Sequence, residues 1–226
     1  MKINNREIKM IIFDLDGTLL ASCHIWKEVD KHFFERRNIP MPEDYGKIIA
    51  PLGFDKASEY TKTTFNLEES CEDIMKEWND EVIDLYRNDI ILKPKAREFL
   101  DLAKSKGAIL NVATANQEEC YMPCLIRNKI DMYFEHIIDV KEFKEGKNSP
   151  AIYLEIAKRY DMDPKDIMVI EDISRGLKNA KKAGFLTCGI YEETSGEEEL
   201  KKEISDIYIH DFDELISLVS WGETNE

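Results

Sequence analysis

Hydrophobic residues along the chain follow two patterns, and the change between them divides the sequence. Residues 10–13 form a short apolar run that ends in Asp-Leu-Asp-Gly, which is typical of a buried strand closed by a turn. From about residue 22 to 89 the apolar positions recur at helical spacing instead. Two helices are predicted there, one from Ile25, Val29, His32, Phe33 and Arg36, the other from Ile74, Trp78, Val82, Leu85 and Tyr86. This stretch of about 70 residues is therefore predicted to be a helical subdomain without strands.

Beyond Pro94, predicted helices and strands alternate. Strands are predicted over 108–113, 136–140, 167–170, 185–190 and 207–209. Helices are predicted over 95–106, 117–129, 150–160, 174–183 and 211–219. Such alternation is typical of an α/β fold with a mainly parallel sheet and helices on both of its faces.

Composition narrows the class of protein further. The 226 residues carry a net charge of −15, and no basic run offsets it, so a nucleic-acid partner is not expected. No apolar stretch approaches the roughly 20 residues that cross a bilayer, so no membrane partner is expected either. The five cysteines are scattered and odd in number. They favour a reduced, cytoplasmic protein. The charge-rich stretch 192–203 is predicted to be a solvated loop and helix.

Polar residues gather just past the predicted strand ends. Parallel sheets bind ligands at the carboxyl ends of their strands, so these residues are candidates for one site. Asp14, Asp16, Gly17 and Thr18 follow the first strand, Thr114 and Asn116 the second, and Glu171 and Asp172 the fourth, while Lys147 precedes a helix. Each has a plainer interpretation as a polar turn, a helix cap or part of a solvated charged run. Their order and placement favour a shared site.

The residue types indicate phosphoryl-transfer chemistry. Asp14, Asp16 and Asp172 offer only hard oxygen ligands, which suit Mg²⁺ held together with a substrate phosphate. With its charge neutralised, Asp14 could attack phosphorus as a nucleophile. Asp16, two residues later, could protonate the leaving oxygen. Thr114 and Lys147 could hold the phosphoryl oxygens.

At these residues the sequence resembles the haloacid dehalogenase superfamily, in its phosphatase and phosphomutase branch. The four signatures of that family correspond to Asp14-Leu-Asp16-Gly17-Thr18, to Val112-Ala-Thr114-Ala-Asn116, to Lys147-Asn-Ser-Pro150-Ala-Ile-Tyr153, and to Glu171-Asp172-Ile-Ser-Arg-Gly176 with Ala183-Gly184. They span the whole core in the family's order. The resemblance implies a Rossmann-like core over 1–20 and 92–226 and a helical cap over 21–91.

The resemblance also implies roles for these residues. Asp14 would be the nucleophile and Asp16 the acid and base, with Thr114, Asn116 and Lys147 binding phosphate. Mg²⁺ would be held by Asp14, the Asp16 carbonyl and Asp172, with Glu171 supporting the site from nearby. Departures from the family pattern are Ala21, Asn148 and Ile173. None of them removes a reacting group, but Ala21 leaves the choice of substrate open.

Three functions are compatible with these features. The first is Mg²⁺-dependent hydrolysis of a small phosphate monoester through an aspartyl-phosphate, by a monomer or weak homodimer. The second is a sugar-phosphate mutase of the beta-phosphoglucomutase type. Hexose-phosphate mutases carry a histidine where this chain has Trp26, which favours hydrolysis. The third is a non-enzymatic binding protein, which the intact reacting groups disfavour.

Overall fold

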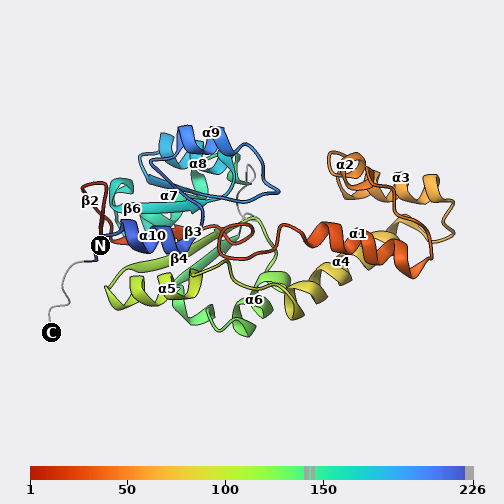
Figure 1. Ribbon diagram of the computed structural model, residues 1–226, viewed down its shortest axis with the longest axis horizontal. Coiled ribbons are helices and arrows are strands. Elements are labelled where there is room, and N and C mark those ends of the chain that lie inside the picture. Colours follow the sequence, from red (N-terminus) through yellow and green to blue (C-terminus); the bar gives the residue numbers. More distant parts are fainter. Residues whose placement is uncertain (140–142, 144–145, 222–226) are drawn as a thin grey trace. The chain divides into compact units, whose positions relative to one another are not determined.

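The computed structural model describes residues 1–139, 143 and 146–221 and divides the chain into two compact units. One is an α/β unit made of Met1–Cys23 and Ile90–Glu226, and the other is a helical unit, His24–Asp89. Figure 1 shows the elements of both. The sequence predicts a helical insert over 21–91. That this unit acts as a cap stays a prediction.

A parallel sheet forms the centre of the α/β unit. Its six strands have the order β5-β4-β3-β6-β7-β8, and every neighbouring pair is parallel. The strands are β3 (Met10–Phe13), β4 (Ile109–Thr114), β5 (His136–Asp139), β6 (Ile167–Glu171), β7 (Leu186–Ile190) and β8 (Ile207–Ile209). The predicted α/β, mainly parallel sheet is therefore confirmed. Val140, the last residue of one predicted strand, lies outside the described residues.

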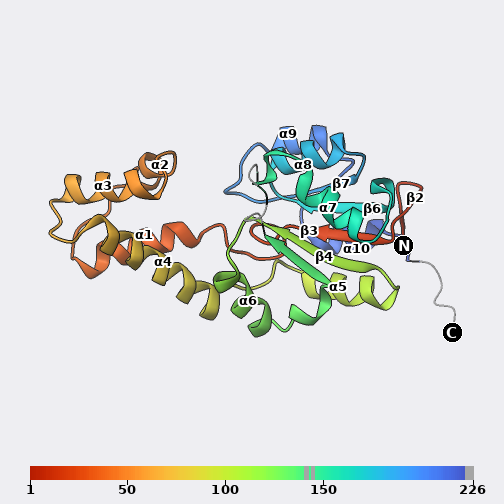
Figure 2. The same cartoon turned by 180° about the vertical axis from the view of Figure 1, so that it is seen from behind.

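Helices cover both faces of this sheet. Side chains alternate along each strand, so both faces carry apolar side chains that the helices bury. Met10 and Ile12 pack into one buried cluster with side chains of α7 and α8. Phe13 points to the opposite face, where its ring lies 6.2 Å from Phe99 of α5 and 6.5 Å from Phe212 of α10. Figure 2 shows α5 and α7 on opposite sides of the strands. The helices of this unit are α5 (Ala96–Ser105), α6 (Glu118–Arg127), α7 (Ala151–Arg159), α8 (Ser174–Lys182), α9 (Glu198–Ile204) and α10 (Phe212–Leu218).

A small hairpin at the start of the chain has no counterpart in the sequence-based prediction. Strands β1 (Lys2–Ile3) and β2 (Arg6–Glu7) pair antiparallel. The turn between them uses Asn4 and Asn5, both with positive φ (48° and 60°). Asparagine tolerates this backbone region, which two-residue hairpin turns require. Two-residue strands are too short to show alternating hydrophobicity, so the prediction missed them.

The helical unit consists of four helices. They are α1 (Ile25–Arg36), α2 (Tyr45–Ile49), α3 (Phe54–Phe65) and α4 (Cys71–Asn88). Helix α4 begins at a capping box, in which the Asp73 N–H donates to Ser70 Oγ over 3.1 Å and the Ser70 N–H donates to the Asp73 carboxylate over 3.3 Å. All five apolar residues predicted for the inner face of α4 are buried.

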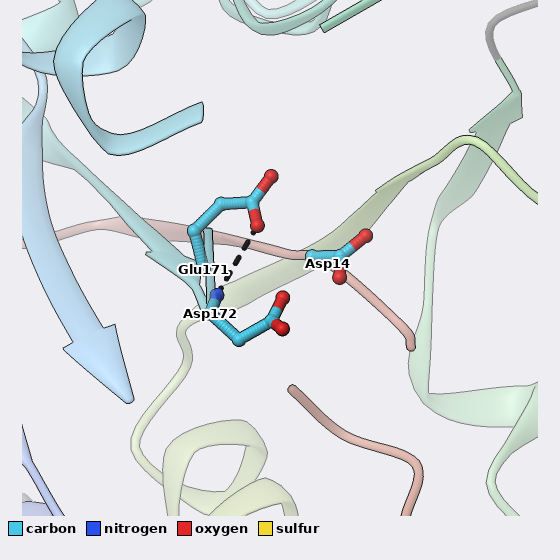
Figure 3. A group of neighbouring side chains, drawn as sticks. All are labelled: Asp14, Glu171 and Asp172. Carbon is cyan, nitrogen blue, oxygen red and sulfur yellow. Dashed lines mark hydrogen bonds between the residues drawn. The ribbon is translucent and has the colours of Figure 1, made fainter. Parts of the chain in front are cut away.

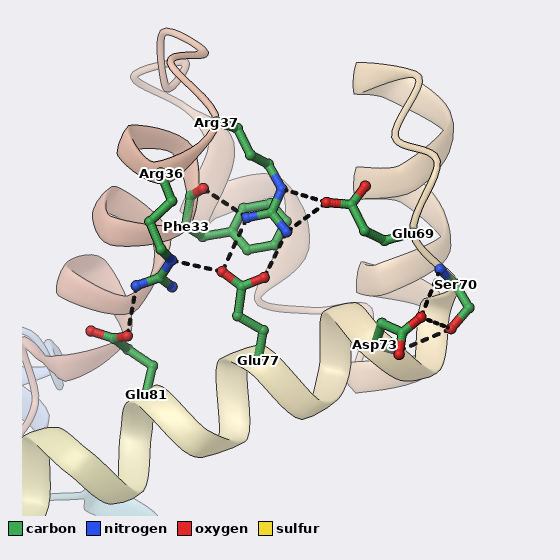
Figure 4. A network of polar contacts seen from close by, with 8 residues as sticks. All are labelled: Phe33, Arg36, Arg37, Glu69, Ser70, Asp73, Glu77 and Glu81. Carbon is green, nitrogen blue, oxygen red and sulfur yellow. Dashed lines mark hydrogen bonds and ion pairs between the residues drawn. The ribbon is translucent and has the colours of Figure 1, made fainter.

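An arginine–glutamate network joins α1 to α4, and it corrects the predicted face of α1 (Figure 4). Arg37 donates to Glu69 and Glu77, and its guanidinium lies 3.7 Å from the centre of the Phe33 ring. Arg36 also donates to Glu77, over 2.8 Å. The sequence pattern placed Arg36 and His32 on the apolar face of α1. Asp30 and Phe34 are buried there instead. The prediction misplaced the buried face of α1 because it included the polar residues His32 and Arg36 in the apolar pattern.

Asp30 is a buried carboxyl without a hydrogen bond or ion pair among the described residues. It is 7% exposed, and burial raises its pKa to about 7. An unfolded aspartate titrates near pH 4, at about 3.9. Between these values the unfolded chain releases the proton and the folded chain keeps it. Rising pH across this window therefore lowers the free energy of unfolding. The stability that protonated Asp30 contributes is lost completely above pH 7.

We expect Asp30→Asn to stabilise the chain more at pH 8 than at pH 4, because the amide carries no charge to bury. The gain in unfolding free energy at pH 8 should be on the order of 1–3 kcal/mol. Urea unfolding at several pH values, followed by circular dichroism, measures it. Asp55→Asn, at an exposed position of α3, is the matched control. A gain for Asp30→Asn that is the same at every pH would contradict this explanation.

Candidate active site

The sheet order brings three signature segments to one edge. Strand β3 lies between β4 and β6, with Phe13 opposite Val112 on one side and Ile170 on the other. Thr114 and Glu171 end their strands, and Asp14 and Asp172 come directly after theirs. Because the strands are parallel, all of these residues lie at the carboxyl edge of the sheet.

Three buried carboxylates converge there: Asp14, Glu171 and Asp172 (Figure 3). Each can offer one oxygen such that the three oxygens lie within 4.8 Å of one another. Burial raises the pKa of Asp14 well above its usual range, and the neighbouring carboxylates add to this rise. Burial and Glu171 raise the pKa of Asp172 to about 7. Carboxylates this close favour a bound cation that offsets their repulsion.

The donor set of this cluster fits Mg²⁺. It consists of hard carboxylate oxygens, the ligands that Mg²⁺ prefers in proteins. Asp14 and Asp172 are two of the three predicted ligands, and Glu171, predicted to support the site, lies in the same cluster. The third predicted ligand, Asp16, was expected to contribute its backbone carbonyl, and that contribution stays a prediction.

Lys147 is the buried cation of the cluster. Its Nζ donates to Asp14 Oδ1, and to Glu171 Oε1 over 2.8 Å. Tyr153 also donates to Glu171 Oε1, over 2.9 Å. Burial lowers the pKa of Lys147, but the charges of Asp14 and Glu171 outweigh burial and raise its pKa overall. Lys147 is thus charged and directed at the predicted nucleophile, although its local sequence is typical of a solvated surface.

The Asp16 carboxylate is held at both of its oxygens. Ser22 Oγ donates to Oδ1 over 2.7 Å, and Asn116 Nδ2 donates to Oδ2 over 3.0 Å. The Asn116 N–H donates to Thr114 Oγ1 over 3.0 Å. Asn116 therefore contacts the predicted acid and base, whereas phosphate binding by Thr114 and Asn116 stays a prediction. The sequence alone indicates no role for Ser22, because a lone serine after a turn carries no distinctive pattern.

Two signature glycines are explained by the carboxylates beside them. Gly17 has a φ of +77°, and a Cβ there would overlap the Asp172 carboxylate and lie 2.7 Å from Cys23 Sγ. A Cβ on Gly176 would overlap the Glu171 carboxylate. Only glycine lets these backbone segments approach the buried carboxylates so closely.

The stretch 192–203 is a loop followed by α9 and is mostly exposed, as predicted, but two of its charged residues are not solvated. Lys201 of α9 is completely buried, and the side chain of Glu192 is only 11% exposed. Glu192 pairs with Lys93 over 2.5 Å. The charged composition of this stretch gave no signal of these contacts, because they depend on residues distant in sequence.

Comparison with known proteins identifies the family. A family model described as haloacid dehalogenase-like hydrolase matches residues 11–190. The chain belongs to this family. The identification made from the signatures, including the phosphatase branch, is therefore confirmed. No helix among the residues that the structure describes is long and apolar enough to span a membrane.

Similar proteins include phosphatases and a mutase. A phosphorylated carbohydrates phosphatase from Thermotoga maritima is 27% identical over 178 residues, which cover 79% of this chain and 82% of that protein. A beta-phosphoglucomutase from Bacillus subtilis is 25% identical, with 81% and 83% covered. A solved Thermotoga maritima structure, for which a beta-phosphoglucomutase role is proposed, shares the fold with a TM-score of 0.83, at 23% identity, over 94% of this chain and 100% of that one.

Proposed function

We propose that the chain is a Mg²⁺-dependent phosphatase that hydrolyses a small phosphate monoester through an aspartyl-phosphate on Asp14. The observation that carries the proposal is the Asp14 carboxylate, which touches Lys147 and lies beside Glu171 and Asp172. A phosphorylated sugar is a suitable substrate class, since relatives are named for such compounds.

The proposed reaction has two steps. An Asp14 oxygen attacks phosphorus while the bond from phosphorus to the alcohol oxygen breaks, and Asp16 gives its proton to that oxygen. Asp16 then takes a proton from water, the water oxygen attacks phosphorus, and the bond from phosphorus to Asp14 breaks. Lys147 offsets the negative charge that develops on the phosphoryl oxygens. Asp14, the Asp16 carbonyl and Asp172 would hold Mg²⁺, which supplies further charge stabilisation when bound.

A mutase is the second candidate because a beta-phosphoglucomutase is among the relatives. The two activities differ in their product. We propose hydrolysis, so a panel of phosphorylated metabolites, tested with and without Mg²⁺, should release inorganic phosphate from at least one member. An isomeric sugar phosphate formed without net phosphate release would identify a mutase instead. We also propose that the helical unit selects the substrate, as caps do in this family.

Removal of Mg²⁺ is expected to reduce phosphatase activity by at least about a hundredfold, since a bound metal supplies several kcal/mol of charge stabilisation. Mg²⁺ should restore the activity, and Ca²⁺ should restore little of it, because Ca²⁺ takes more ligands at longer distances and would loosen the in-line geometry. Phosphate release by chelator-treated protein, with residual metal quantified, measures both effects. Full activity without metal would refute the proposed role of Mg²⁺.

A further inference from the structure

Lys201 is a buried charged residue that the proposed reaction does not use. Its side chain is completely buried, whereas that of its neighbour Lys202 is 43% exposed and pairs with Glu198 and Glu199 on the surface. A buried lysine is costly unless specific partners compensate it. Its partners therefore indicate what the residue does.

The partners of Lys201 lead to the carboxylate cluster. Lys201 Nζ donates to Ser195 Oγ over 2.8 Å. Ser195 Oγ lies 3.0 Å from the backbone carbonyl of Asp172 and 3.0 Å from that of Glu192. The hydroxyl has one proton to give, and Lys201 occupies a lone pair on the same oxygen. The lysine thus orients the serine proton toward these two carbonyls.

The backbone around Asp172 is held at two points. On one side, the Asp172 N–H donates to Glu171 Oε2 over 3.2 Å, a contact drawn in Figure 3. On the other side, the Asp172 carbonyl faces Ser195. Lys93 in turn contacts the segment that carries Ser195, through Glu192 and the carbonyl of Tyr191. Without such restraints, repulsion among the three carboxylates would favour displacement of Asp172 away from Asp14.

We propose that Lys201, acting through Ser195, is a positioning residue that keeps the Asp172 carboxylate in the metal cluster and thereby sets its affinity for Mg²⁺. This inference rests on the proposed function, because it requires the cluster to bind the ion. Residues that orient metal ligands typically contribute 10–100-fold to metal affinity. None of the four family signatures includes Lys201 or Ser195.

The test measures Mg²⁺ binding to the full chain by titration calorimetry after removal of metal, so its readout does not depend on turnover. Lys201→Met, which keeps the side-chain length without the charge, should raise the Kd for Mg²⁺ by about 10–100-fold. Ser195→Ala should raise it in the same direction. Lys202→Met, the matched control at the adjacent exposed lysine, should stay within about twofold. Near-ultraviolet circular dichroism of each variant establishes that it is folded.

A double variant, which combines Lys201→Met with Ser195→Ala, tests whether Lys201 acts through Ser195 or independently of it. If Lys201 acts through Ser195, the double variant should bind Mg²⁺ no more weakly than the weaker of the two single variants. At saturating Mg²⁺, kcat should return to the level of the unsubstituted chain, which a general packing defect would not allow. If Lys201→Met does not fold, the Mg²⁺ affinity of Ser195→Ala alone tests the proposal.

Two results would overturn the inference while leaving the proposed function intact. One is unchanged Mg²⁺ affinity in folded Lys201→Met and Ser195→Ala. The other is multiplication of the two fold-changes in the double variant, which would mean that the residues act separately. Absence of Mg²⁺ binding by the unsubstituted chain would instead refute the proposed metal site, and this inference with it.

Discussion

Replacing Asp14 by asparagine is expected to abolish turnover, with a loss of more than about 10⁴-fold. The amide has nearly the shape of the carboxylate, but it cannot attack phosphorus to form an acyl phosphate. The fold should survive, because Lys147 keeps its ion pair with Glu171 at 2.8 Å. The variant should also relieve part of the repulsion among the buried carboxylates, so its thermal stability should not fall greatly.

Rapid-quench experiments with substrate labelled on the phosphoryl group measure this prediction directly. The unsubstituted chain should carry label on the protein within one turnover, and the Asp14→Asn chain should carry none. Asp16→Asn is the matched control, because it makes the same chemical change two residues away and leaves the nucleophile in place. Label on the Asp14→Asn protein would show that another residue is the nucleophile.

The α/β core could be predicted well from the sequence because each of its strands and helices has its own local pattern of apolar residues. Buried parallel strands require short apolar runs, and 10–13 and 167–170 have them. The sheet order then brings the residues after those runs together, which is why Asp14 and Asp172 could be expected to meet at one edge. The signature glycines added specificity, since Gly17 and Gly176 leave room for the carboxylates of Asp172 and Glu171.

Other features depend on specific side-chain contacts that left no local pattern. Lys201 and Ser195 are only six residues apart, but their contact lies in a segment whose composition is typical of a solvated surface. Asp30 is buried on α1, whereas His32 and Arg36 of the same helix contact glutamates of α4. A charged side chain can be buried only where a suitable partner contacts it, and a single sequence does not show which residue that partner is.

Pro123 lies inside a helix, although proline lacks the N–H that a helix interior uses. The sequence predicts a helix over 117–129 that contains this proline. Helix α6 runs from Glu118 to Arg127 with Pro123 inside it. Pro123 is the sixth residue of this helix, so it removes one hydrogen bond near the first turns, and packing of the buried Cys120, Tyr121, Cys124 and Leu125 holds the helix.

Asp16→Asn is expected to slow turnover by about 10²–10⁴-fold, because it removes the group that gives and takes the proton. The site should keep its shape. The introduced amide could accept from Asn116 through its oxygen and donate to Ser22 Oγ through its nitrogen, so both contacts of Asp16 would have a replacement.

The size of this loss should depend on the leaving group, and that dependence identifies the role of Asp16. A substrate with a poor leaving group, such as an alkyl phosphate, needs the proton and should suffer the full loss. p-Nitrophenyl phosphate releases a stabilised phenolate, so phosphoenzyme formation should be much less affected. Single-turnover rates with both substrates separate this step from hydrolysis of the phosphoenzyme, in which Asp16 is expected to act as the base. Equal impairment of phosphoenzyme formation with both substrates would mean that Asp16 is not the proton donor, and that its contacts with Ser22 and Asn116 serve only to shape the site.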